Sequence, residues 1–255
     1  MRTACMFLVL VGCGTSREAA TVELPVTTAA SALPPVATDL GYEVTVTDLR
    51  IAISALQFTI EGEMHAGTAA NDIAQRSGAT SIIALPHPGH SAGGEVTGEL
   101  PGDFILRWNG RPQPALGTAT LVAGDYHGAN FALRAATGAD GLDAADPLLG
   151  HTFHLEGTVG KDGTTRPFVA VLDVEPDTTV IGAVFEDEIT ETSTETLAVE
   201  FLAADPFEGD TPFDTIDFFT LPETAGRIEI LPGSTTHNIL RRAIQTHDQY
   251  AVVAQ

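Results

Sequence analysis

Alternating apolar and polar residues begin near Tyr42 and predict a long β-strand. Between Tyr42 and Thr47 the two kinds of side chain alternate one by one, which is the pattern of a strand with one buried face. The apolar positions change phase at Leu49 and again at Leu56, and the pattern continues to Ile60. Each change of phase inserts one residue, as a β-bulge or a strand that passes between two sheets does. We therefore expect one long, bent strand in this segment.

Shorter strands follow at intervals and are separated by turn residues. The clearest hairpin signal is the Gly160-Lys161-Asp162-Gly163 turn between apolar stretches at 151–159 and 167–174. Further strands are expected at 104–109, 117–123, 129–135, 179–186, 196–203, 215–221 and 227–231. A fold built almost entirely from short strands and turns is all-β. The pattern favours an antiparallel β-sandwich of roughly ten strands.

The end of the chain changes from the period of a strand to that of a helix. After Pro232 and Gly233, Ser234 or Thr235 can cap a helix at about 235–251. Its apolar stripe would consist of Leu240, Ile244, His247 and Ala251. We therefore expect residues 41–255 to form one β-sandwich domain with a C-terminal helix. A second domain boundary near 140–147 is an alternative that the pattern does not require.

The first residues have the features of an export signal. Met1 to Thr3 is short and positively charged, an apolar run follows, and residues 10–13 (LVGC) resemble a bacterial lipobox. The resemblance implies that a signal peptide at 1–12 is removed and that Cys13 is acylated. An ordinary signal peptide with an incidental cysteine is the alternative. Residues 13–40 are rich in Ala, Thr and Pro without a sustained period, so we expect a flexible tether there.

The charge balance and the absence of known motifs exclude several functions. Asp and Glu outnumber Lys and Arg by 34 to 12, which gives a formal net charge of −22. Such a surface repels phosphate, which argues against nucleic-acid binding and against docking onto anionic lipid by charge. Acidic runs at 186–188 and 205–210 lack the regular spacing of a calcium loop, which favours a solvated surface. Because no nucleophile motif, phosphate-binding glycine loop or zinc-protease motif occurs, we do not expect an enzyme.

The histidines are the strongest candidates for chemistry. Eight occur, and two of them flank a Pro-Gly pair in His87-Pro88-Gly89-His90. Proline fixes one torsion and glycine permits a positive one, so a tight turn can place both imidazoles on one side. Both cysteines precede residue 14, so the exported chain would offer imidazole, thioether and carboxylate ligands, which suit copper or zinc. The best further ligands are His65, then Met64 or His127; the alternative is a polar loop with incidental histidines.

Three other side chains have expected positions in the strands. His151 is in phase with Phe153 and Leu155, so we expect it to point into the core. His154 falls on the opposite face, which we expect to be polar. Trp108, the only tryptophan, alternates with polar neighbours and is expected to anchor the core.

Two segments resemble a known family. Residues 42–51 (YEVTVTDLRI) and 124–133 (GDYHGANFAL) are similar to segments of the methanobactin-associated periplasmic copper-binding proteins. The resemblance implies a secreted β-sandwich that holds copper through histidines. No family ligand maps onto a numbered histidine of this chain.

The sequence therefore favours a lipid-anchored cell-envelope protein that binds a transition metal for scavenging or delivery. Copper is favoured over zinc, with His87, His90, His65, Met64 and His127 as the candidate ligands. The missing acidic residue after Cys13 favours the outer membrane, facing the periplasm or the cell surface. The alternative is a non-catalytic interaction or surface-coat lipoprotein that has no small-molecule ligand, and the sequence identifies no protein partner.

Overall fold

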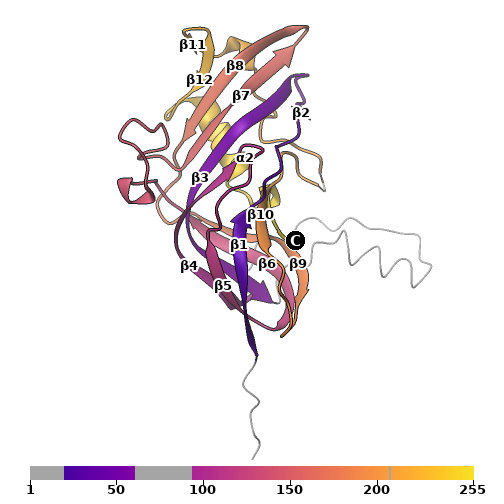
Figure 1. Ribbon diagram of the computed structural model, residues 1–255. Helices are drawn as coiled ribbons and strands as arrows, with labels where there is room; N and C mark the ends of the chain where they lie inside the picture. Colours follow the sequence, from indigo (N-terminus) through magenta and orange to yellow (C-terminus); the bar gives the residue numbers. More distant parts are fainter. Residues whose placement is uncertain (1–19, 61–93, 207) are drawn as a thin grey trace, which may run out of the picture.

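The computed structural model describes residues 20–60, 94–206 and 208–255 (Figure 1). Within these ranges the protein is mostly β, with thirteen strands in one hydrogen-bonded sheet and one α-helix. The strands are β1 (Thr21–Thr28), β2 (Val36–Ala37), β3 (Glu43–Ile60), β4 (Glu95–Trp108), β5 (Gly117–Val122), β6 (Gly124–Leu133), β7 (Phe153–Lys161), β8 (Thr164–Leu172), β9 (Thr179–Ile189), β10 (Leu197–Phe201), β11 (Glu223–Thr224), β12 (Arg227–Ile230) and β13 (Tyr250–Ala254). The helix is α2 (Thr235–Ile244), and 3₁₀ turns occur at η1 (Gly138–Asp140), η2 (Phe218–Thr220) and η3 (His247–Gln249).

Eight of the strands close into a ring. From β3 the order runs through β4, β5, β1, β10, β13, β9 and β6, and β6 pairs with β3 again. Figure 1 shows this ring in the lower part of the molecule. The pairs β1–β10, β13–β9 and β12–β8 are parallel, so the expectation of a purely antiparallel fold is wrong. A sandwich of two separate sheets is not confirmed either, because all thirteen described strands belong to one sheet.

The long bent strand is confirmed and joins the two parts of the molecule. The first half of β3 pairs with β7, which continues to β8, β12 and β11 in the upper part of Figure 1, and its second half pairs with β6. The pairing register shifts between Val46 and Asp48 and between Ser54 and Leu56, where the sequence pattern changes phase. Ala55 has φ of 53°, a left-handed conformation typical of bulges. These bulges bend β3, so that a single strand pairs with neighbours in both parts of the molecule.

Aromatic side chains form much of the buried core. One series of ring contacts runs from Trp108 through Phe201 and Tyr250 to Phe131, with centroid distances of 5.8, 5.6 and 5.0 Å. Trp108 is 1% exposed, and its indole N–H donates to the carbonyl of Val199 at 3.2 Å. The prediction that Trp108 anchors the core is therefore confirmed.

The expected tether is wrong for residues 21–28. These residues form β1, which pairs with β5 on one side and β10 on the other. Pro25 argues against a central strand because it lacks an amide donor, but its neighbours Leu24 and Val26 are fully buried. The burial of Leu24 and Val26 inside the ring stabilises a strand here, although the local composition with Pro25 disfavours one. Residues 13–19, with Cys13 and the expected signal peptide at 1–12, lie outside the described residues.

The expected C-terminal helix is shorter than its apolar stripe indicated. Ser234 caps α2 as predicted, since its hydroxyl accepts from the amide of His237 at 3.0 Å. The helix ends at Ile244, and residues 250–254 form β13, which lies between β10 and β9. The prediction of helix through Ala251 is therefore wrong. Tyr250, Ala251 and Val252 are all buried within β13, and the helical spacing of His247 and Ala251 is coincidental.

None of the helices in the described ranges has both the length and the apolar composition that a membrane crossing requires.

Replacing Thr28 by valine is expected to stabilise the protein by about 1 kcal/mol. Thr28 is 1% exposed, and its hydroxyl has no hydrogen-bond partner within the described residues. Valine has nearly the same shape and removes this unpaired polar group. Thermal unfolding followed by circular dichroism would show a higher Tm. Thr27→Val is the control, because the Thr27 hydroxyl already donates to the Thr28 carbonyl. An unchanged or lower Tm for Thr28→Val would contradict the prediction.

Candidate functional site

Most of the sequence-predicted metal ligands lie outside the described residues. Met64, His65, His87 and His90 fall in the segment 61–93, so their placement is not described. His127 is the only candidate ligand in the described part. Within that part, no group of three or more His, Cys, Asp or Glu side chains is arranged to hold a metal ion.

His127 lies on β6 and pairs with a carboxylate on β9. Its Nδ1 donates to Oε2 of Glu186 at 2.8 Å, and the two side chains are 25% and 31% exposed. The β6–β9 register is irregular between Tyr126 and Gly128, on either side of His127. A carboxylate that accepts from one imidazole nitrogen orients the ring and selects the tautomer whose other nitrogen carries a lone pair. This pair can therefore present Nε2 of His127 as a ligand to a metal ion.

His127 also lies where the chain enters and leaves the segment 61–93. Ile60, the last residue of β3, pairs with Tyr126 of β6 on one side and with Glu95 of β4 on the other. The two described ends that flank this segment are therefore neighbours in the sheet. His127 is next in sequence to Tyr126, so it lies at the same end of the ring.

A second polar cluster is buried between β3, β7 and the loop that precedes β7. Arg50 is 8% exposed; its Nη1 donates to both carboxylate oxygens of Asp146 at 2.9 and 2.8 Å. Its Nη2 donates to Nδ1 of His154 at 3.2 Å, and its Nε lies 3.5 Å from Asp48. Burial and the nearby Arg50 guanidinium lower the pKa of His154, although Glu156 and the aspartates oppose this. The cluster therefore holds His154 neutral and fastens the loop to the sheet.

The expected orientations of His151 and His154 are reversed. His154 is 1% exposed, whereas the side chain of His151 is 34% exposed. The loop before β7 covers the outer face of β3, where Leu148 packs against Ala52, so the face expected to be polar is buried too. One signal in the sequence could have indicated this: Arg50 interrupts an apolar run, and such a charge needs a buried partner.

A third cluster connects His151 to the start of α2 through Asp173. Nδ1 of His151 donates to Oδ1 of Asp173 at 2.7 Å, and the Asp173 amide donates to Nε2 of His237 at 3.1 Å. Nδ1 of His237 lies 3.2 Å from the side-chain oxygen of Asn238. Both nitrogens of His237 therefore have hydrogen-bond partners, which makes it a structural residue that fixes α2 to the end of β8.

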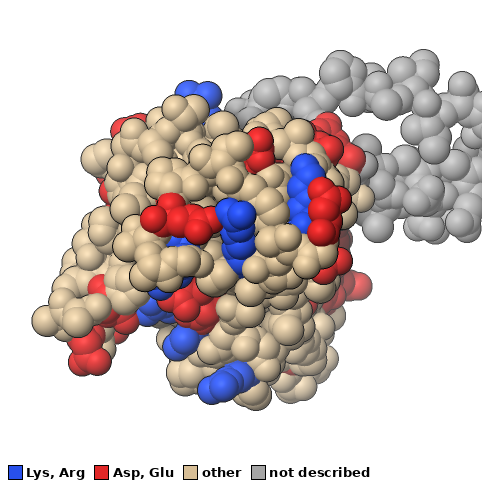
Figure 2. All heavy atoms as spheres, turned by 90° about the horizontal axis from the view of Figure 1, so that it is seen from above, with Lys and Arg blue, Asp and Glu red and all other residues tan. Residues whose placement is uncertain are grey.

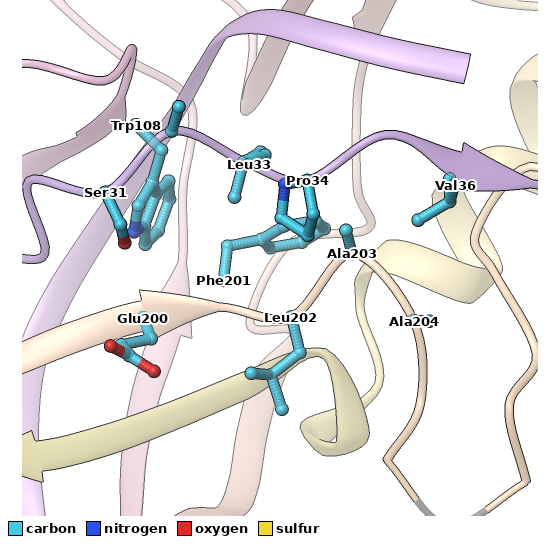
Figure 3. Close-up of a pocket in the computed structure, with 11 residues that line it drawn as sticks. Ser31, Leu33, Pro34, Val36, Trp108, Glu200, Phe201, Leu202, Ala203 and Ala204 are labelled. Carbon is cyan, nitrogen blue, oxygen red and sulfur yellow. The ribbon is translucent and has the colours of Figure 1, made fainter. Parts of the chain in front are cut away.

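An apolar hollow of about 310 Å³ opens beside Trp108 (Figure 3). Its walls come from residues 31–36, which follow β1, and from residues 200–204 at the end of β10. The hollow could not be expected from the sequence, where residues 31–36 were predicted to belong to a tether. The run Leu33-Pro34-Pro35-Val36 was the only local signal, since it is apolar and conformationally restricted.

The described charges do not gather into one patch on the face seen from above. Figure 2 shows acidic side chains scattered over this face, with several basic ones lying directly against them. Ion pairs of this kind include Arg166 with Glu223 and Arg227 with Glu229. Acidic and basic side chains are therefore interspersed on this face.

Comparison with known proteins gave no match. No protein-family model fits the chain, and neither a curated protein nor a solved structure is significantly similar to it.

Proposed function

We propose that this is an exported, lipid-anchored cell-envelope protein that binds a transition metal through histidines, for scavenging or delivery. Copper is the preferred metal and zinc the alternative. Cys13 would carry the lipid and place the protein in the outer membrane. The observation that carries the metal proposal is the His127–Glu186 pair at the end of the ring where the segment 61–93 begins and ends.

Chain connectivity supports this choice of ligands. His65 follows Ile60 by five residues, and His90 precedes Glu95 by five. Five residues span at most about 18 Å, a length that would allow both histidines to reach the end of the ring that carries His127.

The donor types favour copper. The proposed ligands are imidazoles and one thioether, and the exported chain after Cys13 has no further cysteine. Imidazole and thioether ligands suit copper, which also binds more tightly than other divalent first-row metals to such sites. Glu186 would act through His127, since a carboxylate bonded to Nδ1 makes the imidazole a stronger ligand.

We expect His127→Ala to weaken copper binding by at least about 10-fold, and Glu186→Gln to weaken it by roughly 10-fold. Copper affinity would be measured by competition with a chelator on protein purified without a histidine tag. His151→Ala is the matched control, because His151 is also a partly exposed histidine paired with a carboxylate, Asp173. The double variant His87→Ala/His90→Ala tests the remaining ligands and should lose bound copper.

Two results would contradict the proposal. Equal copper content in the wild-type protein and the His87→Ala/His90→Ala variant would show that these two histidines do not bind the metal, and the proposed site would be wrong. Equal losses of copper affinity in His127→Ala and His151→Ala would show that His127 is not a specific ligand.

A further inference from the structure

The turn after β4 places an asparagine directly before an exposed glycine. Asn109 is half-buried, and Gly110 is exposed with φ of 70°. A Cβ atom at Gly110 would lie 3.2 Å from the Cβ of Ala32, so this left-handed and closely packed position favours glycine. The Gly110 amide donates no hydrogen bond to another group of the described residues. Its nitrogen is therefore accessible and carries a proton that no protein acceptor holds.

The side-chain amide of Asn109 is arranged as an electrophile. Its Oδ1 accepts from the Arg111 amide at 3.2 Å and from Nε2 of Gln113 at 2.9 Å. Two donors that point at one carbonyl oxygen stabilise the negative charge that develops there when a nucleophile attacks the carbon. Both hydrogen bonds of this side chain in the described part of the protein involve Oδ1, so none of them holds Nδ2, the nitrogen that would leave.

We infer that the turn after β4 positions Asn109 for spontaneous deamidation, with the Gly110 amide nitrogen as the nucleophile. Water or hydroxide removes the Gly110 amide proton, the bond from this nitrogen to Cγ of Asn109 forms, and the Cγ–Nδ2 bond breaks with release of ammonia. The cyclic succinimide that results adds water at either of its carbonyl groups, which gives aspartate or isoaspartate at position 109. The net reaction exchanges water for ammonia and needs no other reactant.

The other asparagines of the described ranges lack these features. Asn130 is 7% exposed and lies within β6, so water reaches it poorly. Asn238 is exposed, but it lies in α2 and is followed by Ile239, whose β-branched side chain crowds the backbone nitrogen that would have to attack. Asn109 and Gly110 are also the only asparagine–glycine pair in the chain. Asn238 is therefore a control for exposure within the same molecule.

Ageing the full chain in mildly alkaline buffer, followed by peptide mapping with mass spectrometry, tests the inference. Deamidation replaces NH2 by OH, so the mass of the peptide that contains residue 109 increases, and the aspartate and isoaspartate forms separate by chromatography. We expect Asn109 in the folded protein to react at least about 10-fold faster than Asn130 and Asn238. Its rate should lie within about 10-fold of the rate in the urea-unfolded chain, since no hydrogen bond within the described residues holds the Gly110 amide.

A variant separates the effect of the turn from that of the asparagine–glycine pair alone. Gln113→Ala removes one of the two donors to Oδ1 and should slow deamidation of the folded protein by about 3-fold or more, without changing the rate in urea. The inference is overturned if residue 109 is unmodified after ageing or reacts no faster than Asn238. It is also overturned if folding slows the reaction by more than about 100-fold, or if the folded Gln113→Ala protein reacts as fast as the wild type.

Discussion

Replacing Gly157 by alanine is expected to lower the free energy of unfolding by more than about 4 kcal/mol. A Cβ atom at this position would lie 2.2 Å from the backbone oxygen of Thr45 and 2.8 Å from the ring of Phe168. Gly157 of β7 faces the first bulge of β3, where the register shifts between Val46 and Asp48. The Thr45 carbonyl belongs to the backbone of β3, so it cannot move without disrupting the β3–β7 pairing.

Gly160→Ala is the matched control for this substitution. Gly160 lies on the same strand, and its nearest neighbour would be the Thr165 hydroxyl at 3.5 Å, an ordinary contact. We expect its stability to change by less than about 1 kcal/mol, because alanine also restricts the unfolded chain. Urea unfolding of both variants, followed by circular dichroism, measures the difference. Equal midpoints for the two variants would show that β3 does not approach β7 closely at Gly157.

The positions of many strands could be predicted from local pattern. The two changes of phase in 42–60 coincide with register shifts of β3, because inserting one residue is visible in an alternating sequence. The hairpin of β7 and β8 was equally visible. Its turn residues Asp162 and Gly163 have φ of 51° and 76°, and aspartate and glycine tolerate this left-handed conformation best.

Strand partners could not be predicted in the same way. Val26 of β1 pairs with Leu197 of β10 across most of the chain, and the pairing is parallel. Alternation shows which face of a strand is buried but does not identify its neighbour or its direction. The end of the chain illustrates a related limit, since Ala251 fits both a helical stripe and the strand that it actually joins.

The candidate site was predictable in its residue types and not in its geometry. His127 could be named from the sequence as a ligand, but its partner Glu186 follows from the β6–β9 pairing alone. The hollow beside Trp108 brings residues 31–36 against 200–204, two segments that carry no shared motif. Both of these features therefore depend on contacts between distant segments, which local patterns do not contain.

Replacing Arg50 by alanine is expected to destabilise the protein by about 3 kcal/mol near neutral pH. The substitution removes the two hydrogen bonds to Asp146 and the one to His154, and it leaves the poorly solvated Asp146 carboxylate without the guanidinium that pairs with it. The loop that Asp146 fastens to β3 would lose its main polar attachment. Chemical unfolding of the wild-type and variant proteins measures the difference.

The same substitution should also change how stability depends on pH. In the wild-type protein the pKa of His154 is lowered by burial and by Arg50, so its folded-state pKa lies below the unfolded value. This group therefore costs stability as the pH falls through about 6.5. Without Arg50, the carboxylates of Asp48, Asp146 and Glu156 would favour protonated His154 and raise its pKa. The free energies of unfolding of the wild-type and Arg50→Ala proteins should therefore differ less at about pH 6 than at about pH 8.

Arg107→Ala separates this buried cluster from ordinary surface charge. Arg107 also pairs with Asp48, at 2.7 Å, but its side chain is 43% exposed, so its loss should cost no more than about 1 kcal/mol. Its effect should also not depend on pH between about 6 and 8, because no group that titrates there contacts it within the described residues. Two results would contradict this interpretation. One is an equally small loss of stability in Arg50→Ala and Arg107→Ala; the other is a loss in Arg50→Ala that does not change with pH. Either would show that the Arg50 cluster contributes no more than an exposed ion pair. Any other result would show that the Arg50 guanidinium, buried beneath the loop, keeps His154 neutral and holds the loop in place.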